Sequence, residues 1–102
     1  MGKFVIDTGN KVDDFIKSLD KDRRARVDRI YYLFEEYGTN LPAKHLKKLR
    51  DNVWELRPGD IRLLLTIKGN RGLVVHAIYK KTQKIPKKDL KLALKRAKEE
   101  SW

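Results

Sequence analysis

The stretch that most restricts the fold is "VWELRPGDIRLLLTI", residues 53–67, in which two apolar runs flank Gly59-Asp60. A two-residue link that leads with glycine, placed between two such runs, is typical of a tight β-hairpin turn. We therefore predict a hairpin whose register is set by that turn. The predicted pairs are Pro58 with Ile61, Arg57 with Arg62, Leu56 with Leu63, Glu55 with Leu64 and Trp54 with Leu65.

This register sorts the hairpin into two faces, because side chains alternate along a strand. One face is apolar and is expected to bury against helices. The other presents two arginines side by side, a pairing that destabilises strands unless something offsets it. A bound phosphate and Glu55 are the candidates; alternatively, both arginines are solvated residues near a turn. The apolar face holds Trp54, Leu56, Leu63, Leu65 and Ile67, and the opposite face holds Glu55, Arg57, Arg62, Leu64 and Thr66.

Upstream of the hairpin the sequence predicts a short strand at Lys3–Ile6 and two amphipathic helices. Asn10 is the expected cap of the first helix, and Asp20 and Gly38 are the expected start and stop of the second. The two helices together predict a helical hairpin packed on a flat surface. Residues 39–52 form a connector in which we expect a turn of helix. The apolar stripes are Val12, Phe15, Ile16 and Leu19, then Val27, Ile30, Tyr31, Phe34 and Tyr37.

Downstream, Lys68–Gly72 predicts a second turn and residues 73–80 a third, central strand. The sequence does not fix which of its side chains face the helices, because the length of the preceding turn is uncertain. If Val75, Ala77 and Tyr79 face the helices, then His76, Ile78 and Lys80 join the arginine face. Pro86 suits the first turn of a last helix, which is basic apart from a narrow apolar stripe. The stripe consists of Leu90, Ala93, Leu94 and Ala97.

These elements predict a single α+β domain spanning residues 1–102. Its small antiparallel sheet, in the order β-α-α-β-β-β, packs on the N-terminal helical hairpin and is followed by the basic C-terminal helix. The chain carries 25 Lys and Arg against 14 Asp and Glu, a formal charge of +11. Such a charge opposes compaction, so we expect a polyanionic partner, nucleic acid above all, although solubility alone is the alternative.

Several classes of function are disfavoured. The chain has no cysteine, which removes disulfides, thiolate nucleophiles and thiolate metal sites. We expect no membrane span, secretory signal or myristoylation motif, and by default a cytoplasmic protein. No metal and no cofactor is expected, because the two histidines and the carboxylates lack ligand spacing. We interpret His76 as a satisfied core histidine and His45 as a surface residue.

A cationic site remains, and it suits RNA cleavage by the RNA's own 2′-OH. An enzyme for that reaction orients the atoms, helps to move protons and stabilises the added negative charge. Arginine binds phosphate oxygens in a bidentate fork, and a lysine crowded by other cations can serve as acid or base. Glu55 or the Tyr79 hydroxyl could assist. This chemistry requires neither a metal nor a cysteine.

The order of elements, with "VWELRPGDIRLLL" and "YKKTQKIPKKDLKLALKRAKEE", resembles the RelE/ParE superfamily of toxins from type II toxin–antitoxin modules. "WELR" and "KKTQK" before a proline resemble the HigB-like, phage-derived branch. The resemblance covers Asp14 to Lys98. It implies ribosome-dependent mRNA cleavage and neutralisation by a cognate antitoxin. The antitoxin is expected to be a HigA-like helix-turn-helix protein. The toxin is expected to contact operator DNA only through this antitoxin.

The resemblance also assigns residues. The arginine on the strand after the hairpin corresponds to Arg62, the "WELR" arginine to Arg57, and the basic positions after the last strand to Lys80 and Lys81. Ile85 stands where this branch usually has a capping threonine, which puts the capping of the last helix in doubt. The candidate catalytic residues are Arg57, Arg62, Lys80, Lys81 and Glu55, and the candidate RNA-binding residues are Lys84, Lys87, Lys88, Lys91, Lys47 and Lys48.

Two alternatives from other classes stay open. The ParE branch shares the fold but poisons DNA gyrase and has no nuclease role; Arg57, Arg62 and the lysine pair favour the nuclease. A general nucleic-acid-binding module is the other alternative. Against it, no pair of aromatic residues alternates on the basic surface as a stacking platform requires.

Overall fold

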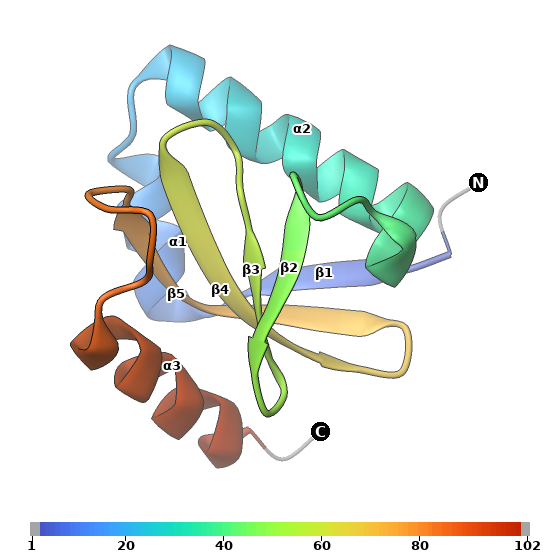
Figure 1. Ribbon diagram of the computed structural model, residues 1–102. Helices are drawn as coiled ribbons and strands as arrows, with labels where there is room; N and C mark the ends of the chain where they lie inside the picture. Colours follow the sequence, from blue (N-terminus) through green and yellow to red (C-terminus); the bar gives the residue numbers. More distant parts are fainter. Residues whose placement is uncertain (1–2, 101–102) are drawn as a thin grey trace.

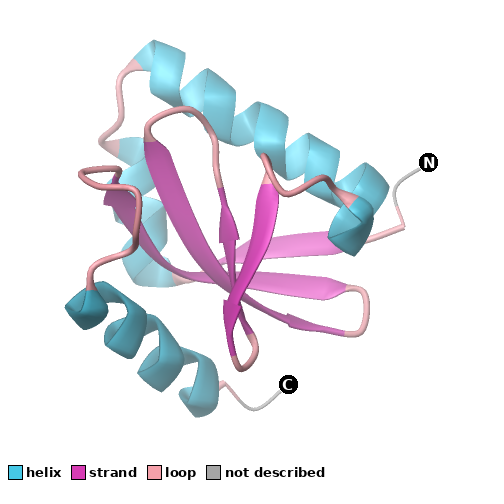
Figure 2. Ribbon diagram, in the orientation of Figure 1, coloured by secondary structure: helices cyan, strands magenta, loops and turns pink. Residues whose placement is uncertain are grey.

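The computed structural model describes residues 3–100. In that part of the chain, a five-stranded sheet is covered by helices on both faces (Figures 1 and 2). The class is α+β, as predicted. The elements are β1 (Val5–Thr8), α1 (Asn10–Lys17), α2 (Lys21–Tyr37), the 3₁₀ turn η1 (Gly38–Asn40), β2 (Leu46–Arg50), β3 (Val53–Leu56), β4 (Ile61–Lys68), β5 (Arg71–Tyr79) and α3 (Lys87–Glu99).

The sheet has the strand order β1-β5-β4-β3-β2. Strands β2 to β5 form an antiparallel meander, and β1 pairs with β5 in parallel. The prediction of a purely antiparallel sheet is therefore wrong at β1, which also begins two residues later than predicted. The connector contains strand β2, which was not predicted. The local sequence "LKKLR" gives no clear strand pattern, and the strand forms because it pairs with β3.

The β3–β4 hairpin has the predicted register: Trp54 faces Leu65, Glu55 faces Leu64, and Leu56 faces Leu63. The Ile61 N–H donates to the Pro58 carbonyl across 3.1 Å and closes the two-residue turn. Gly59 has a φ of 63°, a left-handed value that glycine adopts without a steric penalty. Strand β3 ends at Leu56, and the Arg57 N–H donates instead to the His45 carbonyl, across 3.0 Å.

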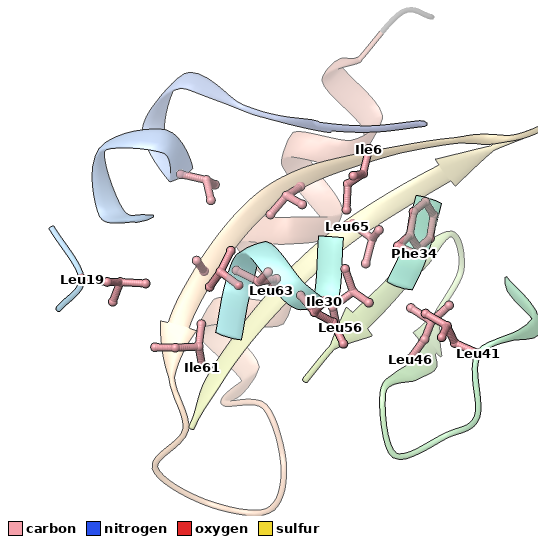
Figure 3. Close-up of a cluster of buried hydrophobic side chains, with 14 residues drawn as sticks. Ile6, Leu19, Ile30, Phe34, Leu41, Leu46, Leu56, Ile61, Leu63 and Leu65 are labelled. Atoms are coloured by element: carbon pink, nitrogen blue, oxygen red, sulfur yellow. The ribbon is translucent and has the colours of Figure 1, made fainter. Parts of the chain in front are cut away.

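The predicted apolar face of the hairpin packs against α1 and α2 (Figure 3). Phe34 and Ile30 of α2 lie over Leu56, Leu63 and Leu65, which are all fully buried. Trp54 and Ile67 pack at the margin of the same cluster. The parity deduced from Gly59-Asp60 is therefore confirmed, and the tryptophan lies on the core side of the sheet.

The predicted stripe of α2 is confirmed except at its end. Val27, Ile30 and Phe34 are buried, whereas Tyr37 is exposed because the helix terminates there, at Gly38. Tyr31 is held by a hydrogen bond between its hydroxyl and Thr8 Oγ1 at 2.6 Å. Burial is the main cause that raises the pKa of Tyr31 to about 12.

The starts of the helices agree only in part with prediction. Asp20 caps α2 by accepting a hydrogen bond from the Arg23 N–H at 3.3 Å, as predicted. Asn10 is not the cap of α1, because the residue before the helix is Gly9. Pro86 is itself the cap residue of α3 rather than part of its first turn, and α3 has no side-chain cap. Ile85 packs instead against the apolar stripe of α3.

Helix α3 covers the second face of the sheet, where Leu64, Val53 and Val75 meet Ala93. The sequence left the facing of this strand open, and the structure places Val75 on the α3 side and Ala77 on the α1–α2 side. A bulge between Leu64 and Leu65 shifts the β4–β5 register by one residue, so Val74 and not Val75 joins the α1–α2 cluster. A bulge of this kind leaves no trace in a simple alternation of residues.

The hairpin turn is tied to α2 by Arg23. Its Nε donates to Asp60 Oδ1 at 3.0 Å, its Nη2 donates to Asp60 Oδ2 at 2.7 Å, and its Nη1 donates to Asp20 Oδ1 at 2.7 Å. The guanidinium also lies 5.4 Å from the centre of the Tyr79 ring. Hydrogen bonds from Arg23 lower the pKa of both aspartates, and these contacts hold the turn against the start of α2.

Acid is expected to loosen this attachment. Because the folded-state pKa values of Asp60 and Asp20 lie below the ordinary 3.8, their contribution to stability is present above pH 3.8 and is lost as the pH falls through the depressed values. Thermal melts at decreasing pH should show a smaller acid-induced drop in Tm for Asp60→Asn than for the parent. Asp13→Asn, which removes an exposed pair with Lys17, is the control and should follow the parent. Parallel curves for Asp60→Asn and the parent would contradict the assignment.

Candidate functional site

The centre of the site is Glu55, which lies on the α3 side of the sheet between the two predicted arginines. Its Oε1 lies 3.6 Å from Arg57 Nε, and its Oε2 lies 3.5 Å from Arg62 Nε. Both guanidiniums therefore lie on one face, as the register predicted. The Glu55 side chain is 5% exposed, so this carboxylate is the internal offset for the two like charges rather than a group open to substrate.

Arg62 is the inner arginine, with a side chain only 8% exposed. Its Nη1 donates to the Gly59 carbonyl at 2.7 Å and to the Ile61 carbonyl at 2.8 Å. Burial, followed by the charge of Arg57, lowers the pKa of Arg62, while Glu55 opposes the shift. Through these contacts Arg62 binds the hairpin turn and Glu55. We therefore assign it a structural role in the site.

Arg57 is the outer arginine, and 29% of its side chain is exposed. Its Nε is buried without a hydrogen-bond partner, so the accessible part of the side chain lies elsewhere along it. The 3.6 Å contact with Glu55 exceeds the length of a charge-assisted hydrogen bond. Arg57 is thus the more exposed of the two arginines, and its Nε lies against Glu55.

The predicted lysines of the last connection surround this end of the sheet. Lys80 follows β5 directly, and its N–H donates to the Asp60 carbonyl at 2.7 Å, which holds it beside the hairpin turn. The Lys80 side chain is exposed, and the ring of the preceding Tyr79 makes an edge-to-face contact with Phe15 of α1, with the ring centres 5.4 Å apart. Lys81 and Lys84 are exposed in the loop that follows. The basic loop therefore begins beside the hairpin turn, two residues before which Arg57 lies.

The remaining predicted RNA-binding residues divide into two groups. Lys87, Lys88 and Lys91 are exposed on the first turns of α3 and extend the basic surface. Lys47 pairs with Glu55 across the strands, so it lies on the arginine face. Lys48 pairs with Trp54 and lies on the opposite face, with its Nζ 5.7 Å from the centre of the Trp54 ring. The structure therefore does not bring Lys48 to the site.

A hydrogen-bonded cluster that sequence reasoning missed holds α3 on the sheet. His76 Nε2 lies 2.8 Å from Asp89 Oδ1, and Arg96 Nη1 lies 3.4 Å from His76 Nδ1. Arg96 also donates to the Val75 carbonyl at 2.8 Å. Since Arg96 can only donate, Nδ1 accepts and Nε2 donates, which leaves no ring nitrogen free for substrate. The interpretation of His76 as a satisfied histidine is confirmed; a carboxylate two turns before an arginine was its only sequence signal.

The arrangement can hold a phosphate at the end of the sheet. Arg57, held against a buried carboxylate, and the exposed lysines of the β5–α3 loop both lie near the hairpin turn, where the lysines supply further charge and exchangeable protons. Among residues 3–100 no group of three potential metal ligands occurs, and no helix there is long and apolar enough to cross a membrane.

Comparison with known families gives one match over most of the chain. The model of the family described as phage-derived protein Gp49-like (DUF891) matches residues 14–98. The match begins in α1 and ends in α3, so it includes the hairpin, Glu55, both arginines and the basic loop. Among curated proteins, no relative matches the chain.

Proposed function

Because the chain belongs to the Gp49-like family of phage-derived proteins, a family associated with toxin–antitoxin modules, we propose that it is the toxin of a type II module that cleaves mRNA on the ribosome. The observation that carries the proposal is the accessible Arg57, buttressed by buried Glu55 and flanked by exposed lysines at one end of the sheet. The likeness to RelE/ParE toxins of the HigB-like branch, seen in "WELR" and "KKTQK", supports it.

In the proposed reaction the 2′-oxygen of one nucleotide attacks the adjacent phosphorus, and the bond from phosphorus to the 5′-oxygen breaks. Arg57 binds the non-bridging oxygens and stabilises the charge that grows on them. One of Lys80 and Lys81, in its neutral form, accepts the proton of the 2′-OH, and the other, in its charged form, gives a proton to the departing 5′-oxygen. Glu55 and Arg62 hold Arg57 in place. This route needs no metal ion.

The partners follow from the same proposal. The lysines of the loop and of α3 bind messenger and ribosomal phosphates, so association weakens steeply as salt rises. A cognate antitoxin with a HigA-like helix-turn-helix restrains the toxin and makes the contacts with operator DNA. The cytoplasm is the place of action, because translating ribosomes are the site of cleavage.

The deciding experiment is cleavage of a defined mRNA in a reconstituted translation system, with the cut sites mapped by primer extension. We expect cuts at defined codon positions when ribosomes translate the message, and an intact message when ribosomes are omitted. Equal cleavage without ribosomes would indicate a general ribonuclease. An intact message in both reactions, together with inhibition of DNA gyrase in a plasmid supercoiling assay, would favour a ParE-like toxin.

A further inference from the structure

A groove runs along the flank of α2 and meets the proposed reaction site only at Arg57, which lines one of its ends. Two hollows, of about 350 Å³ and 140 Å³, share Arg29, Leu33 and His45 in their linings. The larger extends to Tyr37 and the smaller to Arg26, so the groove follows about three turns of one helix. With a rise of about 1.5 Å per residue, the stretch from Arg26 to Tyr37 is about 16 Å long.

The groove lies mainly on the α1–α2 side of the sheet, whereas Glu55, Arg62 and the exposed lysines of α3 lie on the other. Its opposite wall is the connector between η1 and β2, with Leu41 and Pro42, and the hairpin turn at Gly59 closes one end. Arg57, which bonds to His45 through its backbone, belongs to that closed end. A molecule seated in the groove would therefore reach the turn that carries the accessible arginine.

The lining combines an apolar floor with a cationic rim. The floor is the apolar part of the lining and consists of Leu33 from α2 and of Leu41 and Pro42 from the connector. The exposed ring of Tyr37 lies at the open end. The rim carries Arg26, Arg29 and Lys44, all exposed. Among the described residues that line the two hollows, none is Asp or Glu, and Asp60 outside them approaches Arg26 to 4.0 Å. The rim is thus open to negative charge from a partner.

The apolar floor favours a protein over a nucleic acid as the acidic partner. Aliphatic side chains bury well on leucine and proline, whereas a nucleic acid gains more from stacked rings and phosphate contacts than from an aliphatic floor. An amphipathic helix lays an apolar ridge into such a groove and leaves its flanking residues at the rim. We propose that the groove docks an acidic amphipathic helix from a protein partner. This inference rests on the proposed function, under which the partner is the antitoxin.

The test combines growth with direct binding. The matched variants are Arg29→Glu/Lys44→Glu in the groove and Arg24→Glu/Lys11→Glu outside it, each reversing two exposed cations. The probe is the protein encoded by the adjacent reading frame, and rescue is the restoration of growth when it is co-expressed with the toxin. We expect the groove variant to stay toxic and to escape rescue, and the outside variant to be rescued like the parent.

Binding is measured by titration calorimetry with both pairs of changes placed in a Lys80→Ala/Lys81→Ala background, which lies outside the lining of the groove and removes both proposed proton donors, so that the proteins can be produced without toxicity. The groove changes should weaken antitoxin binding about 100-fold or more, because glutamates then face the acidic helix. Antitoxin binding equal to that of the outside variant would overturn the proposal. So would a loss of affinity for purified ribosomes with antitoxin binding intact, which would make the groove an RNA surface. A parent that is not toxic in cells speaks against the proposed function instead, and the calorimetry still decides the groove.

Discussion

Replacing Arg57 with alanine is expected to lower ribosome-dependent mRNA cleavage by about 100- to 1,000-fold. Arg57 is the arginine whose side chain is accessible, while Glu55 orients it from beneath. The variant should keep the parent's fold, because Arg62 remains to neutralise Glu55 after the change. Cleavage is measured as the rate of appearance of primer-extension stops, and Tm is measured on the same preparation.

Arg57→Lys is the informative control for this prediction. Lysine keeps the positive charge but lacks the planar fork that binds two phosphate oxygens, so most of the cleavage activity should still be lost. Arg71→Ala, at an exposed pair with Asp7 in a distant part of the sheet, should cleave at the parent's rate. Full activity in Arg57→Ala, with an unchanged Tm, would remove the central residue of the proposed mechanism.

Replacing Arg62 with alanine is expected to destabilise the protein by about 3–5 kcal/mol, enough to unfold a marginal domain. The change leaves the buried Glu55 carboxylate with Arg57 alone, at 3.6 Å, and strips the Gly59 and Ile61 carbonyls of their donor. Urea denaturation followed by circular dichroism gives the free energy of unfolding. If Arg62→Ala loses its toxicity, the expected cause is therefore unfolding and not the loss of a catalytic group.

The pair Glu55→Leu/Arg62→Met separates the two roles. Removing both buried charges and filling their volume with apolar atoms should recover much of the stability that Arg62→Ala loses. Its activity should stay low, because Arg57 then has no carboxylate to orient it. If Arg62→Ala proves as stable as the parent and yet inactive, Arg62 contacts the substrate directly and its burial is relieved when RNA binds.

The hairpin shows how far local sequence reasoning reaches. A glycine-led two-residue turn permits few registers, and alternation then assigns every side chain of both strands to a face. Glu55, Arg57 and Arg62 were placed together on that basis, and their contacts confirm it. Lys47 and Lys48 show the limit: without knowledge of strand β2, two adjacent lysines could not be assigned to opposite faces.

Contacts between distant segments were beyond that reasoning. The parallel pairing of β1 with β5, the bulge that turns Val75 toward α3, and the bidentate contact of Arg23 with Asp60 each join residues far apart in the chain. Asp60 was interpreted only as a turn residue, and its second role as an anchor to α2 depends on where the helical hairpin crosses the sheet. The contact of His76 with Asp89 likewise depends on where α3 docks.

The amino-acid sequence by itself determined the hairpin, its two faces, the helical hairpin and the strongly basic character of the C-terminal segment, because turn geometry, periodicity and charge are local properties. The tertiary structure alone decided which arginine is buried and which is accessible. That difference arises because the Arg62 side chain is enclosed by its own turn and by Glu55, whereas Arg57 lies past the end of β3, where the sheet no longer covers it. Burial depends on all the neighbours of a side chain at once, and most of those neighbours are remote in the chain.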